Sequence, residues 1–122
     1  MHHSIFTART SGPAQQNDGA KLFEFNFSAR DDVFAGHFPG RPILPGIFQI
    51  EIARAAAEWA CDRRFAVNEI SKSKFQRPIL PDEPLKLELK LTETDDMVSA
   101  RANFSVNGEP AGETLLQLRQ CD

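Results

Sequence analysis

A histidine and a glutamate, His37 and Glu51, are the residues of this sequence best suited to carry out chemistry. Both belong to the stretch GHFPGRPILPGIFQIE, which starts at Gly36. His37 lies in a loop rich in proline and glycine, so its ring position is fixed before a ligand arrives. Glu51 follows fourteen positions later in an apolar segment, where a carboxylate is costly to bury unless it is paired. An imidazole and a partly desolvated carboxylate that face one cavity can divide the acid and base work of a reaction.

Gly46 supplies a third candidate group, its backbone N–H. A glycine in the first turn of a helix leaves this N–H without a partner and open to close approach. The positive end of the helix dipole lies at the same place. The donor therefore suits an oxygen that gains negative charge during a reaction.

Each of these residues also has a plainer interpretation. A single loop histidine usually lies at the surface, and a helical glutamate usually faces water or pairs with a basic neighbour. Arg54 lies three residues after Glu51 and can form such an ion pair on the helix surface. Pro45-Gly46 is also an ordinary way to begin a helix. Residue types and spacing alone leave both interpretations open.

The elements that must position these groups are one helix and several strands. A helix is expected just after Pro45, because IFQIEIARAAAEWA is rich in helix formers and free of breakers. Its apolar residues cover most of the circumference, which is typical of a helix buried in the middle of a structure. Earlier in the chain, LFEFNFSA places Phe23, Phe25 and Phe27 on one face and indicates a half-buried strand. The segment before it, SGPAQQNDG, is rich in turn-forming residues.

The chain after the helix is typical of strands. FAVNEISKSKF leads into an RPILP loop, and LKLELKL alternates from Leu85. After a TETDD turn, the segment from Met97 to Val106 alternates loosely. Asn107-Gly108 is a strong hairpin signal, and ETLLQLRQ forms the last strand. One buried helix among mostly antiparallel strands predicts an α+β fold, in a single domain that covers residues 1–122.

Composition excludes several classes of protein. The net charge of -3 and pI near 5.6 give no general reason to expect a nucleic-acid partner. No apolar run approaches the roughly 18 residues that span a membrane, and the N-terminus lacks the apolar core of a secretory signal. Cys61 and Cys121 fit neither a metal site nor a disulfide framework, so we expect free thiols, no metal and a cytoplasmic location. Self-association is plausible, because a chain of 122 residues buries only about two-thirds of its unfolded surface.

The stretch from Gly36 to Glu51 resembles the active-site signature of a known family, the 3-hydroxyacyl-acyl carrier protein dehydratases of type II fatty-acid synthesis (the FabZ and FabA type). That signature runs Gly-His-Phe-Pro-Gly-x-Pro-x-x-Pro-Gly, then four residues, then a catalytic acid. The later segment SKFQRPILPDEPL resembles the downstream Phe-x-x-Pro-x-x-Pro-Gly-Asp segment of that family. With the order of elements, the resemblance covers about Phe25 to Leu118.

The resemblance implies a hot-dog fold, in which a curved antiparallel sheet wraps around one long central helix. It implies a homodimer in which each active site takes its histidine from one subunit and its acid from the other. His37 would remove the proton on C2 of a 3-hydroxyacyl thioester, and Glu51 would protonate the departing C3 hydroxyl. Gly46 would hold the thioester carbonyl, and Phe38 would wall the tunnel. No cofactor is implied beyond the phosphopantetheine arm of the acyl carrier protein.

Three departures from the family pattern predict a specialised member. The usual N-terminal Leu-Pro-His-Arg-Tyr-Pro-Phe-Leu-like run has no counterpart. The position four after the acid, often glutamine in the family, is Ala55. The downstream Pro-Gly-Asp is replaced by Pro81-Asp82-Glu83. We therefore expect a dehydratase of aryl-polyene, polyketide or modified fatty-acyl synthesis.

An acidic carrier protein would dock on positive charge near the tunnel mouth. The candidates are Arg41, Lys72, Lys74 and Arg77, which flank the two proline loops. Their alternative interpretation is ordinary solvated charge.

Two other classes of function remain open from the sequence. One is a hot-dog thioesterase or enoyl isomerase on the same scaffold. The other is a catalytically silent subunit that pairs with a second hot-dog protein in a heterodimer. Assembly beyond a dimer also stays open.

Overall fold

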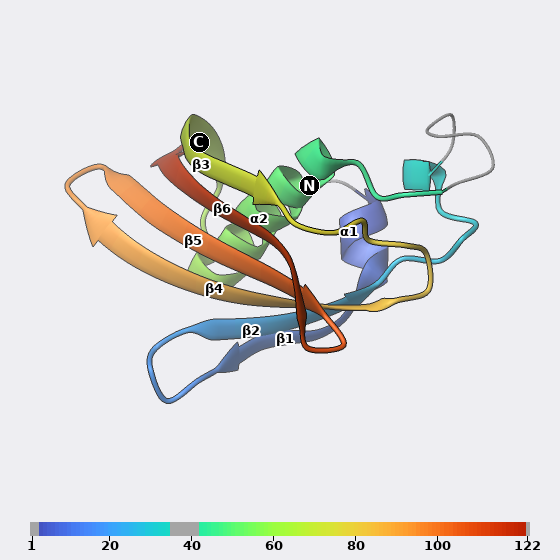
Figure 1. Cartoon of the computed structure of the whole chain (residues 1–122). Coiled ribbons are helices and arrows are strands. Elements are labelled where there is room, and N and C mark those ends of the chain that lie inside the picture. Colours follow the sequence, from blue (N-terminus) through green and yellow to red (C-terminus); the bar gives the residue numbers. More distant parts are fainter. Residues whose placement is uncertain (1–2, 35–41, 122) are drawn as a thin grey trace.

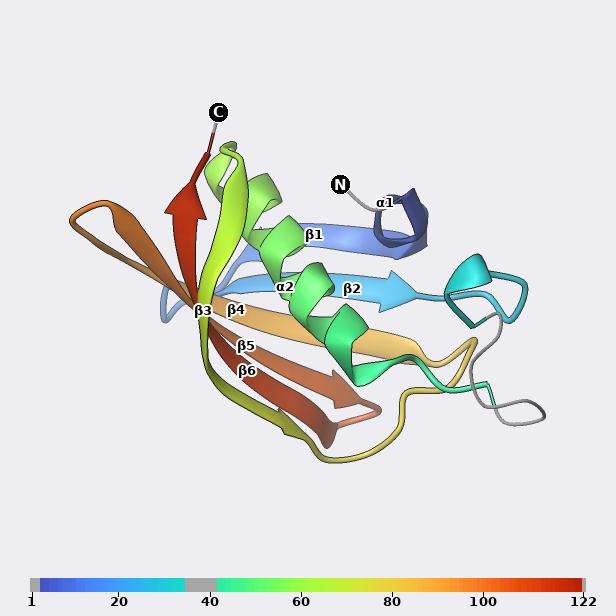
Figure 2. The same cartoon turned by 90° about the horizontal axis from the view of Figure 1, so that it is seen from above.

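The computed structural model describes residues 3–34 and 42–121, and Figure 1 shows their arrangement. The elements in chain order are α1 (His3–Ala8), β1 (Arg9–Gln15), β2 (Lys21–Asn26), the short 3-10 helix η1 (Asp32–Phe34), α2 (Gly46–Cys61), β3 (Phe65–Phe75), β4 (Pro84–Thr94), β5 (Met97–Val106) and β6 (Glu109–Gln120). The strands form one antiparallel sheet in the order β1-β2-β4-β5-β6-β3. This sheet curves around α2 (Figures 1 and 2), so the expected α+β hot-dog fold is confirmed.

The central helix α2 begins where the sequence predicts, directly after Pro45. It ends at Cys61, and the capping residue Asp62 has a left-handed backbone with φ of 53° and an N–H that donates to the Glu58 carbonyl. The alanines of its middle turns, Ala53 and Ala55–Ala57, are fully buried. Such small side chains let the sheet approach the helix backbone closely, so the sheet can wrap around the helix as in a packed core.

Alternation along the strands builds the inner face of the sheet. In β4, Leu85, Leu87 and Leu89 point inward and are buried, while the residues between them are exposed or half-buried. β5 alternates more strictly than its sequence indicates, with every second residue from Val98 buried. The predicted hairpin between β5 and β6 is confirmed: Asn107 and Gly108 both have positive φ, as a two-residue type I′ turn requires.

The N-terminal part of the chain differs from the sequence-based expectation. The turn-rich segment after residue 10 contributes to β1, which contains Gly12 and Pro13 and pairs with β2 through an irregular register. β1 forms an edge of the sheet, where a proline is tolerated because one side of the strand needs no ladder hydrogen bond. The helix α1 was also not predicted. Tertiary contacts secure both elements: the Ser4 hydroxyl of α1 donates to the Asp31 carboxylate over 2.6 Å, and the Arg9 guanidinium of β1 lies 4.1 Å above the Trp59 ring.

The opposite edge of the sheet is β3, which pairs with β6 alone within the described chain. Beyond its first three residues β3 is exposed along its length, and the side chains of Ile70 and Phe75 are about half exposed. An edge strand of this length with apolar side chains offers unpaired backbone groups to another chain. Among the helices described, none is both long and apolar enough to cross a bilayer.

Candidate active site

Three of the predicted site residues, His37, Phe38 and Arg41, lie outside the described residues. The described flanks of their loop are anchored. Before it, Phe34 is buried; after it, Leu44 is also buried and its N–H donates to the Ile79 carbonyl over 2.8 Å. The described chain therefore leads from the buried Leu44 directly into α2, which begins at Gly46.

Gly46 is the first residue of α2, and no side chain of the described residues caps this end of the helix. The Phe75 ring packs against the glycine so closely that a Cβ there would lie 2.7 Å from a ring carbon. Beside them is a cleft of about 280 Å³, lined by residues 43–46, Gln49 and residues 75–78. The structure thus places the predicted thioester donor at the wall of a cleft between the two proline-rich loops.

Glu51 lies in the second turn of α2, and its carboxylate is bound by Arg54. The Arg54 Nε donates to both carboxylate oxygens over 3.1 and 3.0 Å, and Nη2 donates to Oε1. The same guanidinium contacts Glu58 over 2.9 Å and donates to the Phe65 carbonyl over 3.1 Å. The hydrogen bond to Glu51 is the largest cause that raises the pKa of Arg54 above its usual value. The ion pair weighed from the sequence as an alternative is therefore present, and Arg54 is only 15% exposed.

This pairing fixes Glu51 without removing it from solvent. About a third of the Glu51 side chain remains exposed, while Arg54 links it to the first residue of β3. Glu58 completes the connection, because its Oε2 accepts the Phe65 N–H over 2.9 Å. A carboxylate held in one orientation and still open on one side can bind a hydroxyl group or a water molecule.

Removing the Arg54 guanidinium should destabilise the fold. R54M keeps much of the apolar stem but leaves Glu51, Glu58 and the Phe65 carbonyl without their donor, so we expect a loss of about 1–3 kcal/mol in the free energy of unfolding. The measurement is urea denaturation, with R63M as control because the carboxylate that Arg63 pairs with, Glu93, is exposed. Equal midpoints for the two variants would contradict the structural role of Arg54.

The described carrier-docking candidates are partly engaged in pairs. Lys72 donates to Glu113 over 3.0 Å, and this hydrogen bond is the main cause that lowers the pKa of Glu113. Arg77 donates to both oxygens of Glu83 over 3.1 and 2.9 Å, which orders the loop after β3. Lys74 is exposed on β3 near the same end of the strand. All three lie along β3 and the loop that follows it.

The departures in the downstream loop have structural explanations. Asp82 stands where the family pattern has glycine, and its φ of 63° is the left-handed conformation that glycine adopts most readily and aspartate tolerates. Its N–H donates to the Phe27 carbonyl over 2.7 Å. Glu83 binds Arg77 and also accepts the Leu80 N–H over 2.8 Å. Ala55 is fully buried in the core and brings no polar group to the site.

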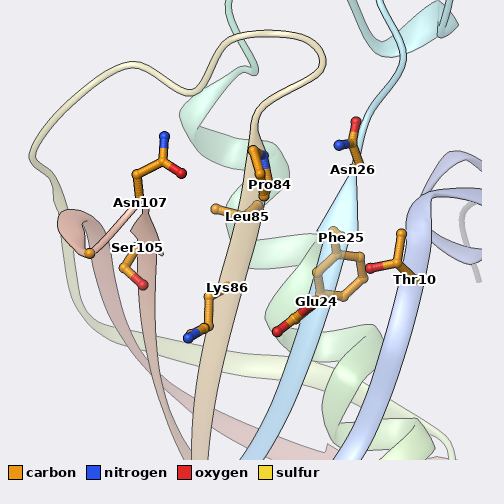
Figure 3. A pocket seen from close by; sticks show the side chains of 10 residues that line it. Thr10, Glu24, Phe25, Asn26, Pro84, Leu85, Lys86, Ser105 and Asn107 are labelled. Carbon is orange, nitrogen blue, oxygen red and sulfur yellow. The ribbon is translucent and has the colours of Figure 1, made fainter.

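A second hollow, of about 290 Å³, lies on the face of the sheet turned away from α2 (Figure 3). Figure 3 shows Glu24 and Asn26 on β2 and Lys86 on β4 beside it, with α2 behind the strands. None of the predicted site residues lines it. The candidate site is therefore the cleft at the start of α2.

Sequence reasoning did not single out Gln49, which lines the same cleft as Gly46. Its side chain is only 3% exposed, and its Oε1 has no hydrogen-bond partner. The available signal was a neutral polar residue in the otherwise apolar run from Ile47 to Ile50.

Comparison with known proteins places the chain in a family. Residues 13–113 match the family model described as ApeI-like, ApeI dehydratase. The chain is 33% identical over 100 residues to the 3-hydroxyacyl-[acyl-carrier-protein] dehydratase FabZ of Haemophilus influenzae strain 86-028NP, covering 75% of this chain and 68% of the relative. It is 34% identical over 98 residues to the FabZ of Oenococcus oeni, covering 74% and 70%.

A solved structure agrees with this assignment. The dehydratase heterocomplex ApeI:P from Xenorhabdus doucetiae superposes with a TM-score of 0.74 at 25% identity, covering 91% of this chain and 96% of the other. Sequence relatives, family model and fold therefore converge on the same class of enzyme. The chain belongs to the ApeI-like family of hot-dog dehydratases.

Proposed function

We propose that this enzyme removes water from a 3-hydroxyacyl thioester carried on an acyl carrier protein and releases a trans-2-enoyl thioester. The observation that carries the proposal is the His37…Glu51 signature, with Gly46 at the start of α2 beside a cleft. The FabZ relatives are named for the same reaction. No metal or other cofactor takes part in the proposed chemistry.

The elimination divides between the three groups. His37, as neutral imidazole, removes the proton on C2, which the thioester makes weakly acidic. The Gly46 N–H and the positive end of α2 stabilise the negative charge that develops on the thioester oxygen, and one such donor contributes roughly 3–4 kcal/mol. Glu51, as the carboxylic acid, delivers a proton to the departing C3 hydroxyl, directly or through a water molecule, and is left as the carboxylate. Phe38, next to His37, walls the channel in this scheme.

We propose a homodimer in which His37 of one subunit meets Glu51 of the other. The exposed β3 edge, with Ile70 and Phe75, supports this proposal, because an antiparallel pairing of two such edges would extend the sheet across the dimer. Glu51 is tied through Arg54 to the first residue of that same strand. The carboxylate therefore lies close to the edge at which a partner would add.

The carrier protein would approach along β3 and the loop that follows it. Arg41, Lys72, Lys74 and Arg77 are the proposed docking residues; Lys74 is the strongest, because Lys72 and Arg77 already bind carboxylates. We place the reaction in the cytoplasm, which suits the free thiols of Cys61 and Cys121. We place the reaction in a specialised pathway, such as aryl-polyene, polyketide or modified fatty-acyl synthesis, because the chain departs from the family pattern at Ala55 and at Pro81-Asp82-Glu83.

A second candidate is a subunit that works only with another hot-dog protein. The solved ApeI:P structure is a dehydratase heterocomplex, which is the observation in its favour. The chain keeps both His37 and Glu51, which argues for an active subunit.

Incubation with a 3-hydroxyacyl carrier protein, followed by mass measurement of the intact carrier, tests the proposal. We expect the loss of one water from the carrier-bound acyl group. A free carrier thiol would instead identify a thioesterase. Migration of the double bond leaves the mass unchanged, so isomerase activity is read from an NMR spectrum of the enoyl product. No change with the chain alone, but water loss after a second hot-dog subunit is added, would identify the heterodimer.

A further inference from the structure

Gln49 is buried in α2 without a partner for its amide oxygen. The side chain is 3% exposed. Among the residues that the structure describes, its Oε1 is the single buried side-chain nitrogen or oxygen atom without a hydrogen-bond partner. An unpaired polar group in a protein interior is destabilising, and native structures contain few of them. A methionine of similar length would fill the same space without this cost. The amide oxygen of Gln49 therefore indicates a hydrogen-bond donor that the described part of the folded chain does not supply.

The surroundings of Gln49 are built to accommodate its carboxamide. It packs against Gly112 of β6, where a Cβ would lie 2.1 Å from the amide oxygen. Any larger residue at position 112 would displace the amide. The Lys74 carbonyl lies 3.4 Å from the same Cβ position, so the amide sits where β3 and β6 meet.

The carboxamide shares its cleft with the proposed thioester donor. Gln49 follows Gly46 by three residues, a spacing that places both on one face of the helix. Both line the cleft of about 280 Å³ beside the Phe75 ring. The described residues that line this cleft bring one charged side chain, Arg77, and Glu83 neutralises it. A neutral ligand with a hydrogen-bonding group fits this environment better than an ionic one.

We propose that Gln49 is a substrate-binding residue whose carboxamide hydrogen-bonds the amide-and-thioester segment of the acyl-phosphopantetheine arm beside Gly46. This inference rests on the proposed function. A carboxamide offers one acceptor and two donors, which matches the donor and acceptor of an amide and the acceptor of a thioester. The hydrocarbon part of an acyl chain offers neither. The residue would thus recognise the arm and fix the register of C2 and C3 along the cleft.

The test uses the full chain and a 3-hydroxyacyl N-acetylcysteamine thioester, which keeps the thioester and one amide of the arm but needs no carrier docking. For Q49M we expect kcat/KM to fall about tenfold, the value of one net hydrogen bond. We expect the thermal unfolding midpoint to rise, because the variant removes an unpaired buried amide. The control is Q117M, which makes the same change on β6 outside the cleft and should leave kcat/KM within about twofold.

A second variant tests whether the position of the Gln49 amide matters, and not only its presence. G112A keeps Gln49 but pushes against its amide oxygen, so kcat/KM should fall although the carboxamide is still present. Unchanged kcat/KM in folded Q49M would overturn the inference, as would a lower unfolding midpoint, which would reveal a structural partner for the amide. A wild-type chain that dehydrates neither this thioester nor the carrier-bound substrate would instead refute the proposed function.

Discussion

Replacing His37 with alanine is expected to lower turnover of a 3-hydroxyacyl thioester by roughly a hundredfold to ten-thousandfold. The imidazole is the proposed base at C2, and a positioned general base contributes a factor of this size. The sequence around His37 is rich in proline and glycine, whose backbone preferences do not depend on the histidine side chain, so we expect the variant to fold normally. The measurement is single-turnover kinetics on the carrier-bound substrate, with circular dichroism to confirm the fold.

His2 supplies a matched control for this prediction. H2A makes the same change outside the signature and should retain the wild-type rate. A near-normal rate in folded H37A would mean that another group removes the C2 proton. The role assigned to the histidine would then be wrong.

Replacing Glu51 with glutamine is expected to lower turnover by a similar factor, roughly a hundredfold to ten-thousandfold. Glutamine keeps the shape of the side chain and can still accept a hydrogen bond from Arg54, but it cannot deliver a proton to the C3 hydroxyl. The loss should appear in kcat, with little change in KM, because the proton moves only in the transition state. Steady-state kinetics on the 3-hydroxyacyl N-acetylcysteamine thioester separate kcat from KM.

Glu58 is the control for Glu51, because both carboxylates bind the same Arg54 guanidinium. E58Q weakens the ion pair with Arg54 and the hydrogen bond that Glu58 accepts from the Phe65 N–H, but it leaves the proposed acid, Glu51, in place. Its kcat should stay within a few-fold of wild type while its stability falls. Equal losses of kcat in E51Q and E58Q would mean that the network is structural and that Glu51 is no acid.

The helix and most strands were predictable because their local signals agree with the fold. The apolar run after Pro45 marks α2, the Leu85–Leu89 alternation marks β4, and Asn107-Gly108 marks the last hairpin. β1 lacked such a signal, since Gly12 and Pro13 are typical of turns and only pairing with β2 makes the segment a strand. Local preference is weakest at a sheet edge, and tertiary contacts decide the outcome there.

The sequence predicts which residues of the candidate site carry the chemistry, but not which distant residues pack against them. The signature names His37, Gly46 and Glu51 from a short stretch of sequence. Contacts from distant residues are invisible in such a stretch: Phe75 packs on Gly46 from β3, and Gly112 makes room for Gln49 from β6. The network around Arg54 was foreseen only as a pair with Glu51, because its link to Phe65 depends on how β3 leaves the helix.

A mixture of two inactive variants tests the central claim, a site shared between an imidazole of one subunit and a carboxylate of the other. H37A and E51Q are combined in equal amounts, exchanged under mild denaturant and assayed for water loss. Random pairing makes half of the dimers mixed, each with one intact site of two, so activity should return to about a quarter of wild type. If subunit exchange is verified and activity stays at the level of the separate variants, the two groups do not meet across a dimer.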